Sequence, residues 1–222
     1  MLVKDFITKE IPVLKSFDTG DYALTLMDDY KLKHLPVVSD DSFYYKGIIS
    51  EKELLSYSDL SVNIGNIYLA ESPSVRLETH LLEVLALITR NKLSLLPVIS
   101  DRDIYEGVVT REHLVDVCAD FCQADAPGST IILEVSPTDY SVTDIARIIE
   151  SNNAHILSLQ THPEDTNGQL LTTLKIDAED ASAVIRSFER FNYTAVWHFM
   201  ENGMVDDIFQ QRMNELIHYM NI

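Results

Sequence analysis

An internal repeat constrains the fold of this 222-residue chain more than any other feature. Residues 35–40 read Leu-Pro-Val-Val-Ser-Asp, and residues 96–101, which lie 61 positions further along, read Leu-Pro-Val-Ile-Ser-Asp. After each copy, a glycine is followed by two β-branched residues and a hydroxyl residue, at 47–50 and at 107–110. A self-match whose spacing is retained to within one residue indicates one structural unit used twice.

Each copy predicts a helix, two strands and a second helix. In the first copy the expected elements are a helix at about 20–32 capped by Asp18 or Thr19, strands at 35–38 and 44–49, and a helix that Ser50 caps. In the second they are a helix opened by Glu78 or Thr79, strands at 95–99 and 105–109, and a helix that Thr110 caps and that runs to about 121. The glycine in each second strand is expected to permit close backbone approach.

The paired motifs, Leu-Pro-Val and Gly-apolar-apolar-Ser/Thr, resemble a tandem pair of CBS domains, the regulatory Bateman module. The resemblance covers residues 1–122, with repeats at about 1–60 and 62–122. It implies a cleft between the paired units that binds an adenosine-containing ligand such as AMP, ADP, ATP or S-adenosylmethionine. In that family a Ser/Thr after the glycine strand and an Asp three residues later typically hold the ribose.

The match to this ligand motif is incomplete. Ser50 and Thr110 supply the hydroxyl, but Glu53 and His113 stand where the family has Asp. Glu53 retains a carboxylate, whereas His113 together with Arg111 is suited to a phosphate. By resemblance the candidate ligand-binding residues are Ser50, Glu53, Thr110, Arg111, His113, Pro36 and Pro97. The alternative is that Ser50 and Thr110 are only helix caps.

The second half of the chain has a different hydrophobic pattern from the two repeats. Residues 123–129 form a small, polar linker with Pro-Gly, and residues 130–200 predict the order β-α-β-β-α-β, a ferredoxin-like split unit. The expected elements are strands at 131–135, 155–162, 169–176 and 193–199, a helix that Ser141 opens, and a helix at about 181–191. After a CBS pair, this resembles an ACT-type domain, as in stand-alone CBS–ACT proteins, some of them named acetoin-utilisation proteins. The fold class is therefore α+β.

The resemblance to ACT domains implies a small effector, often an amino acid, in the turn between the first strand and the first helix. That turn is 136–141, where Asp139 and Ser141 could contact an amine, although turn and cap roles explain both residues. The alternative is a sheet that only associates with a partner. Residues 204–222 predict a C-terminal amphipathic helix, which favours a homodimer contact.

Charge and composition argue against several classes of partner and of function. The net charge of −18 argues against nucleic-acid and anionic-membrane partners, and the absence of a long apolar run or a signal sequence makes a cytoplasmic location the default. Cys118 and Cys122 have no second pair at zinc-ligand spacing, so no metal site is expected. No glycine-rich phosphate loop, Ser-centred elbow or His-x-x-x-His pair is present, so no enzyme is expected.

These observations predict a non-enzymatic regulatory sensor that binds an adenosine-containing ligand in a CBS cleft. In that hypothesis the ACT-like domain serves dimerisation or a second effector. The alternative hypothesis is a ligand-free dimeric interaction scaffold whose CBS sites are degenerate.

Overall fold

The computed structural model describes residues 1–67, 69, 72–164 and 167–200. The chain divides into two compact units, Met1–Phe121 and Cys122–Ile222. Unit 1 contains both copies of the repeat, and its boundary with unit 2 lies beside the linker predicted at 123–129.

Both repeats of unit 1 have the predicted order. The first repeat consists of α1 (Gly20–Asp29), β1 (His34–Val38), β2 (Tyr45–Ser50) and α2 (Glu51–Leu54). The second consists of α3 (Leu81–Asn91), β3 (Leu95–Ile99), β4 (Tyr105–Thr110) and α4 (Arg111–Phe121). Two 3-10 turns, η1 (Val3–Asp5) and η2 (Ile64–Asn66), precede α1 and α3 respectively. The predicted helix-strand-strand-helix order is thereby confirmed twice.

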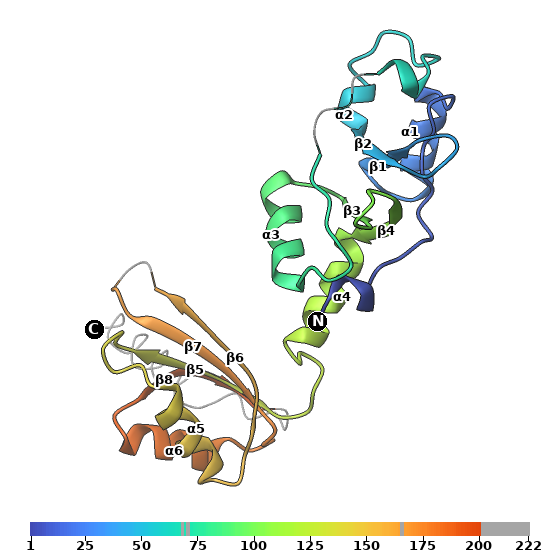
Figure 1. Cartoon of the computed structure of the whole chain (residues 1–222). Coiled ribbons are helices and arrows are strands. Elements are labelled where there is room, and N and C mark those ends of the chain that lie inside the picture. The colour runs from blue at the N-terminus through green and yellow to red at the C-terminus, as the bar shows by residue number, and fades with distance from the viewer. Residues whose placement is uncertain (68, 70–71, 165–166, 201–222) are drawn as a thin grey trace, which may run out of the picture. The chain divides into compact units, whose positions relative to one another are not determined.

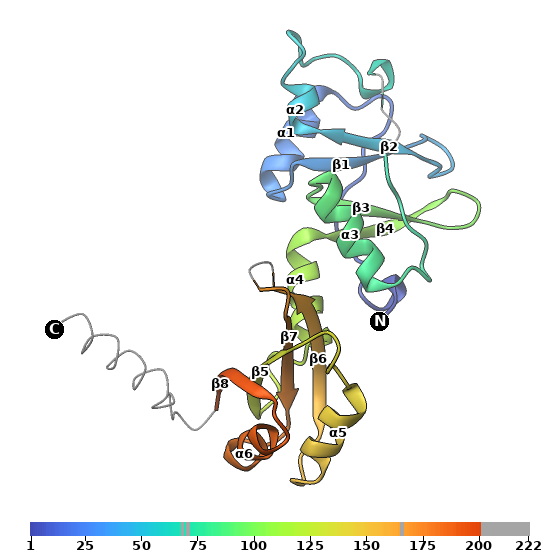
Figure 2. The ribbon, with the colours of Figure 1, turned by 90° about the vertical axis from the view of Figure 1, so that its left-hand side faces the viewer.

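The two strands of each repeat form an antiparallel hairpin. Pro36 pairs with Ile48 in the first hairpin, and Pro97 pairs with Val108 in the second. Figure 2 shows the two hairpins side by side, with their turns on the same side of unit 1. Backbone hydrogen bonds between Tyr45 and Asp103 and between Tyr105 and Phe43 join them at these turns. A single two-stranded hairpin is only marginally stable in water, and here each hairpin packs beside the other.

The first repeat also contributes a side chain to the core of the second. One cluster of buried side chains includes Leu35, Ile49 and Leu54 of the first repeat. The other surrounds Leu96 of the second repeat, yet it also contains Ile48 of the first. Successive residues of β2 thus point to opposite faces and contribute to different cores.

Gly107 confirms the predicted close backbone approach. The N–H of Val108 donates to the carbonyl of Thr8, and the N–H of Thr8 donates to the carbonyl of Val108, both at 2.9 Å. A Cβ atom at Gly107 would lie 2.5 Å from the Thr8 oxygen, and the φ of Gly107 is +152°. Only glycine allows the N-terminal segment to pair with β4 at this distance.

The predicted caps are confirmed except at α3. The Thr19 side chain accepts from the N–H of Tyr22 at the start of α1. The assignment of Glu78 or Thr79 as the cap of α3 is wrong, because the cap is His80, whose ring nitrogen accepts from the N–H of Leu82 at 3.3 Å. Thr79 instead accepts from the N–H of Arg76 at 3.1 Å, which closes the preceding turn.

Unit 2 has the predicted β-α-β-β-α-β order. Its elements are β5 (Ser129–Val135), α5 (Val142–Glu150), β6 (Ile156–Pro163), β7 (Leu170–Ile176), α6 (Ser182–Arg190) and β8 (Thr194–Phe199). The strands form one sheet in the order β6-β7-β5-β8, in which all neighbours are antiparallel. Each helix therefore connects two strands with a third between them, as in a split β-α-β unit. The α+β class is confirmed.

Both helices of unit 2 lie on the same side of the sheet (Figure 1). The core between them includes Ile131 and Leu133 of β5, Ile148 of α5 and Phe188 of α6. Alternation along β5 sends every second side chain to this core. The C-terminal helix predicted at 204–222 lies outside the described residues.

Candidate functional site

Ser50 and Glu53 form a reciprocal pair at the end of β2. The N–H of Glu53 donates to Ser50 Oγ at 3.1 Å, and Glu53 Oε2 accepts from the N–H of Ser50 at 2.8 Å. Ser50 Oγ also donates to Glu53 Oε2 at 2.7 Å. This is a capping box for the single turn of α2. Ser50 and Glu53 therefore cap α2. The same hydroxyl and carboxylate also have the chemistry to bind a ribose diol.

The corresponding residues of the second repeat are arranged differently. Thr110 Oγ1 accepts from the N–H of His113 at 3.2 Å, so it also caps its helix. His113 Nδ1 lies 4.0 Å from Asp116 Oδ2 on the exposed side of α4. The Arg111 guanidinium donates to the carbonyl of Ile88 at 3.1 Å, in α3. This position therefore offers a hydroxyl but no carboxylate beside it, as its sequence predicted.

A hollow of about 340 Å³ lies between α3 and α4, with Arg111 at its polar side. Its other lining residues are mostly apolar: Leu85, Ile88, Thr89, Leu114, Val115 and Cys118. Val115 is 66% exposed, which is unusual for an apolar residue in a helix. This groove is a candidate protein contact rather than a nucleotide cleft, because polar groups are few.

The ends of the two turns bring Tyr45 and Tyr105 together. The N–H of Tyr45 donates to the carbonyl of Asp103 at 2.9 Å, and the N–H of Tyr105 donates to the carbonyl of Phe43 at 3.0 Å. Burial raises the pKa of both phenols, and the neighbouring Tyr105 raises that of Tyr45 further. Neither buried hydroxyl has a hydrogen-bond partner in the part of the chain that the structure describes. An unpaired buried donor calls for water or a ligand.

His34 and Ser94, with Lys33, form a contact between the repeats that we call the inter-repeat seam. His34 Nδ1 accepts from the N–H of Ser94 at 3.1 Å and lies 3.0 Å from Ser94 Oγ. Ser94 Oγ in turn accepts from the N–H of Lys33 at 3.1 Å. The His34 ring is therefore a polar group whose Nδ1 is hydrogen-bonded across the two repeats.

The seam also brings the two predicted half-sites near each other. His34 pairs with Ser50 in the hairpin register, and the Ser94 carbonyl accepts from the N–H of Arg111 at 2.9 Å. Burial lowers the pKa of His34, Arg111 lowers it further, and Glu53 opposes this change. The charged groups of α2 and α4 therefore both act on one ring.

Pro36 and Pro97 occupy a different environment from the other candidates. Both are buried within their strands. Their carbonyls accept from the N–H of Leu14 at 2.8 Å and from the N–H of Val75 at 3.0 Å. Each proline thus receives an additional segment of chain alongside its hairpin, which is a structural role that the motif alone did not reveal.

The sequence did not single out the seam partner Ser94 or the two tyrosines. Tyr45 and Tyr105 each precede the repeat glycine by two positions, so the repeat itself contained the signal for them. Ser94 occupies the position that corresponds to Lys33, where the two copies differ. Only the fold shows that this difference lets a small hydroxyl enter the seam.

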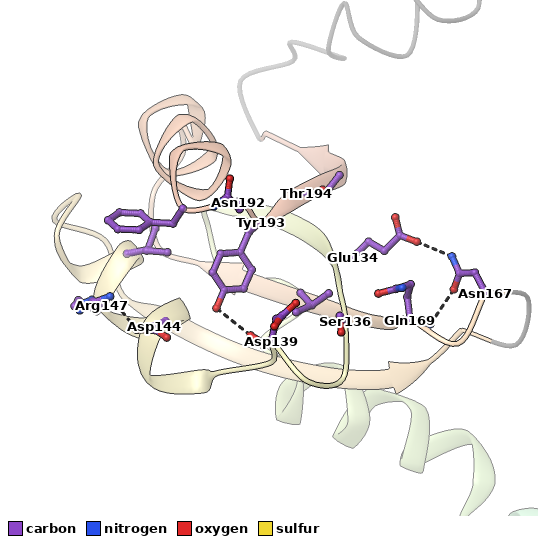
Figure 3. A pocket seen from close by; sticks show the side chains of 13 residues that line it. Glu134, Ser136, Asp139, Asp144, Arg147, Asn167, Gln169, Asn192, Tyr193 and Thr194 are labelled. Carbon is purple, nitrogen blue, oxygen red and sulfur yellow. Dashed lines mark hydrogen bonds and ion pairs between the residues drawn. The ribbon is translucent and has the colours of Figure 1, made fainter.

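A second candidate site lies in unit 2, in a cavity of about 690 Å³. Figure 3 shows that it lies among the turn after β5, the start of α5, the β6–β7 turn and the turn before β8. Asp139 and Ser136 come from the predicted effector turn. Ser141 does not line the cavity, since it caps α5 by accepting from the N–H of Asp144 at 3.2 Å.

The charged groups of this cavity are partly paired. Arg147 Nη2 lies 2.9 Å from Asp144 Oδ1, and Asn167 Nδ2 donates to Glu134 Oε1 at 2.6 Å (Figure 3). Burial raises the pKa of Tyr193, and the charges of Asp144 and Asp139 raise it further. The cavity thus presents one guanidinium and several carboxylates, a combination suited to a zwitterion.

Metal-ligand clusters and membrane-spanning helices are both absent from the described residues. No group of three or more His, Cys, Asp and Glu side chains there is arranged to hold a metal ion. None of the helices formed by the described residues has the length and apolar character needed to cross a membrane.

Comparisons with known proteins identify the repeats. The family model named CBS domain matches residues 3–59 and 64–120. Inosine-5'-monophosphate dehydrogenase of Bacillus subtilis (strain 168) is 25% identical over 156 residues, which cover 68% of this chain. The match spans only 32% of that enzyme's length.

Among solved structures, two are similar to this chain over about half of its length. A structure assigned as the acetoin utilization protein AcuB from Vibrio cholerae has a TM-score of 0.50 and 22% identity, over 56% of this chain and 95% of that one. CBSX2, a CBS-pair protein of Arabidopsis thaliana, in complex with AMP has a TM-score of 0.47 and 25% identity, over 54% of this chain and 97% of that one. The predicted tandem CBS architecture is confirmed.

Proposed function

This chain belongs to the CBS domain family, and from that premise we propose that it is a non-enzymatic regulatory protein that binds an adenosine-containing ligand in unit 1. The ligand class is AMP, ADP, ATP or S-adenosylmethionine. The observation that carries the proposal is the pair Ser50 and Glu53, whose hydroxyl and carboxylate lie 2.7 Å apart at a helix start. Such a pair can accept from and donate to adjacent ribose hydroxyls.

The two repeats have unequal roles in this proposal. The first repeat supplies the ribose-binding pair, because the second repeat has His113 where a carboxylate is needed. Arg111 of the second repeat supplies positive charge for a phosphate after releasing the Ile88 carbonyl. The ligand then spans the inter-repeat seam, and Thr110 adds a hydroxyl from the second helix start.

Binding across the seam would regulate the protein through the packing of the repeats. The Ser50–Glu53 capping box must open to contact the ribose, so binding is coupled to the first turn of α2. A ligand shifts an arrangement only by its difference in affinity for the two states. The unpaired hydroxyls of Tyr45 and Tyr105 are a second set of groups that such a shift can expose to a ligand or to water.

We also propose that unit 2 is an ACT-like domain with a second, amino-acid effector. The cavity beside the turn after β5 supports this, because Arg147 can pair with an α-carboxylate and Asp139 with an α-ammonium group. In this proposal the protein is a homodimer, and the groove that Val115 lines in unit 1 is one candidate contact.

The alternative function is a ligand-free dimeric scaffold with degenerate sites. It is favoured by the capping box itself, since both members of the ribose-binding pair already satisfy each other. The two hypotheses differ in one measurable property, which is whether any nucleotide stabilises the folded protein.

A thermal-unfolding titration of the full chain tests the nucleotide proposal. A ligand at about 100 times its Kd raises the free energy of unfolding by about 2.7 kcal/mol, because it binds only the folded state. We expect this for at least one of AMP, ADP, ATP and S-adenosylmethionine. Glu53→Gln retains a capping box but loses the charge, so we expect it to weaken binding by about tenfold or more.

A matched control separates binding from helix capping. Ser50→Ala removes a cap and the ligand hydroxyl, whereas Ser141→Ala removes only a cap, in unit 2. Each change costs about 1 kcal/mol of stability, but only Ser50→Ala should abolish the nucleotide-dependent increase. If none of the four compounds raises the stability at millimolar concentration, and light scattering shows a dimer, the scaffold function replaces this proposal.

A further inference from the structure

The turn between β6 and β7 contains an Asn-Gly dipeptide, Asn167-Gly168, beside the cavity of unit 2. Both residues are exposed. Gly168 has a φ of +72°, and no atom of the described residues lies within 4 Å of a Cβ added to it. The peptide nitrogen after Asn167 is therefore not shielded by a side chain of its own residue. An asparagine amide reacts most readily with its own backbone in this situation.

Two hydrogen bonds hold the Asn167 amide beside this peptide bond. Asn167 Oδ1 accepts from the N–H of Gln169 at 2.9 Å, and Asn167 Nδ2 donates to Glu134 Oε1 at 2.6 Å (Figure 3). Because the first partner donates and the second accepts, the positions of the amide oxygen and nitrogen are defined. The first bond closes an Asx-turn, a ring of atoms that includes Asn167 Cγ and the peptide nitrogen of Gly168.

We propose that Asn167 is a site of spontaneous covalent modification that converts its side-chain amide into a carboxylate. A base removes the proton of the Gly168 N–H, and this nitrogen forms a bond to Asn167 Cγ. The bond between Cγ and Nδ2 breaks, and Nδ2 leaves as ammonia with a proton from the conjugate acid of that base. Water then opens the resulting succinimide ring at either carbonyl, which gives an aspartyl or an isoaspartyl residue. The net reaction consumes water and releases ammonia, so it requires no oxidant.

The N–H of Gln169 is placed to assist the first step. As the Gly168 nitrogen adds to Cγ, negative charge develops on Asn167 Oδ1, to which this N–H already donates. A donor that faces a developing oxyanion stabilises the transition state. The turn thus supplies the unshielded nucleophile, the electrophile and an oxyanion donor within three consecutive residues.

The product replaces a hydrogen-bond donor with an acceptor. An oxygen would stand where Nδ2 now donates to Glu134 Oε1, so that two carboxylates would face each other at hydrogen-bond distance and repel. Asn167 and Glu134, which belongs to β5, both line the cavity. Conversion therefore adds a negative charge to the cavity wall and removes a bond between the turn and β5. This consequence holds whether or not the cavity binds an effector.

Peptide mapping by mass spectrometry of the full chain, incubated at mildly alkaline pH, tests the modification. Asn192 is an internal control, because it lines the same cavity, is exposed and has a φ of +62°, but is followed by Tyr193. We expect Asn167 to convert several-fold faster than Asn192, and an isoaspartyl methyltransferase to label the product. Gly168→Ala should slow the conversion several-fold, because its methyl group crowds the attacking nitrogen.

The wild-type protein alone can overturn the proposal. Conversion of Asn167 that is no faster than that of Asn192 would show that the turn does not promote the reaction. Conversion of Asn167 that occurs only in urea would show that the folded turn protects the amide.

Asn167→Asp reproduces the aspartyl product and tests its consequence. We expect a lower temperature for the thermal-unfolding transition of unit 2 than in the wild type. Glu134→Gln in the same chain provides an amide donor to the new carboxylate, so the double variant should recover most of this loss. Asn192→Asp adds the same charge to another part of the cavity wall, and Glu134→Gln should not restore its stability in the same way. Equal losses for Asn167→Asp with and without Glu134→Gln would refute the repulsion between positions 134 and 167.

Discussion

Single side chains at the inter-repeat seam serve two purposes. His34 holds the repeats together through its unprotonated Nδ1, which accepts from the N–H of Ser94. The same ring lies within the electrostatic influence of Glu53, Arg111 and Lys33, so it senses charge on both helix starts. Protonation of Nδ1 would remove this acceptor, which makes the seam sensitive to pH.

We therefore expect His34 to make stability depend on pH. Burial lowers its pKa in the folded protein below its ordinary value of about 6.5, so the unfolded chain takes up the proton first as the pH falls. The contribution of His34 is complete above about pH 6.5 and decreases as the pH falls toward the lower, folded pKa. His34→Asn retains an acceptor but does not titrate, so its stability should fall less over this range.

Urea unfolding of both proteins between about pH 8 and pH 5 measures this difference. Titration of every other group is common to the two proteins and cancels in the comparison. Equal losses of stability in wild type and His34→Asn would show that the ring does not titrate differently in the folded state.

At the scale of elements, the decisive contact is the pairing of the N-terminal segment with β4. Gly107→Ala would place a Cβ atom 2.5 Å from the Thr8 carbonyl oxygen, at a φ of +152°. Gly168→Ala is a matched control, because Gly168 also has a positive φ, of +72°, but no atom lies within 4 Å of its added Cβ.

We expect Gly168→Ala to cost about 1 kcal/mol from backbone strain alone. Gly107→Ala should cost about 1–3 kcal/mol more, since the added methyl group also displaces the paired segment. Chemical denaturation gives both free energies of unfolding, and amide hydrogen exchange at Thr8 and Val108 reports the pairing itself. Retained protection of these two amides in Gly107→Ala would contradict the steric argument.

At the scale of the whole molecule, the two proposed effectors belong to different units. Scanning calorimetry of the full chain should resolve two transitions, which Ser141→Ala assigns, because its cap lies in unit 2. We expect nucleotides to raise the transition of unit 1 and a panel of free amino acids to raise that of unit 2. Arg147→Gln should abolish the amino-acid response and leave the nucleotide response intact.

Amino acids that leave the unit 2 transition unchanged, or that act equally on Arg147→Gln, would refute an effector site in this cavity. The nucleotide proposal does not depend on this outcome, because its ligand residues all lie in unit 1.

The sequence by itself determined the architecture of this protein. Two copies of a motif predicted two like units, and alternation after the linker predicted the sheet of unit 2, because hydrophobic period and turn residues are local properties. The helix starts at Ser50, Thr110 and Ser141 were predicted for the same reason, since a cap forms between residues three positions apart.

Only the tertiary structure decided which distant residues these local elements contact. His80 rather than Thr79 caps α3, because the Thr79 hydroxyl accepts from the N–H of Arg76 in the preceding turn. The local sequence pattern does not show which of these two roles Thr79 takes. The contact of His34 with Ser94 joins residues 60 positions apart, and their approach depends on how two complete hairpins pack. A motif specifies its own backbone, but the charges and hydroxyls beside it come from distant segments that only folding brings together.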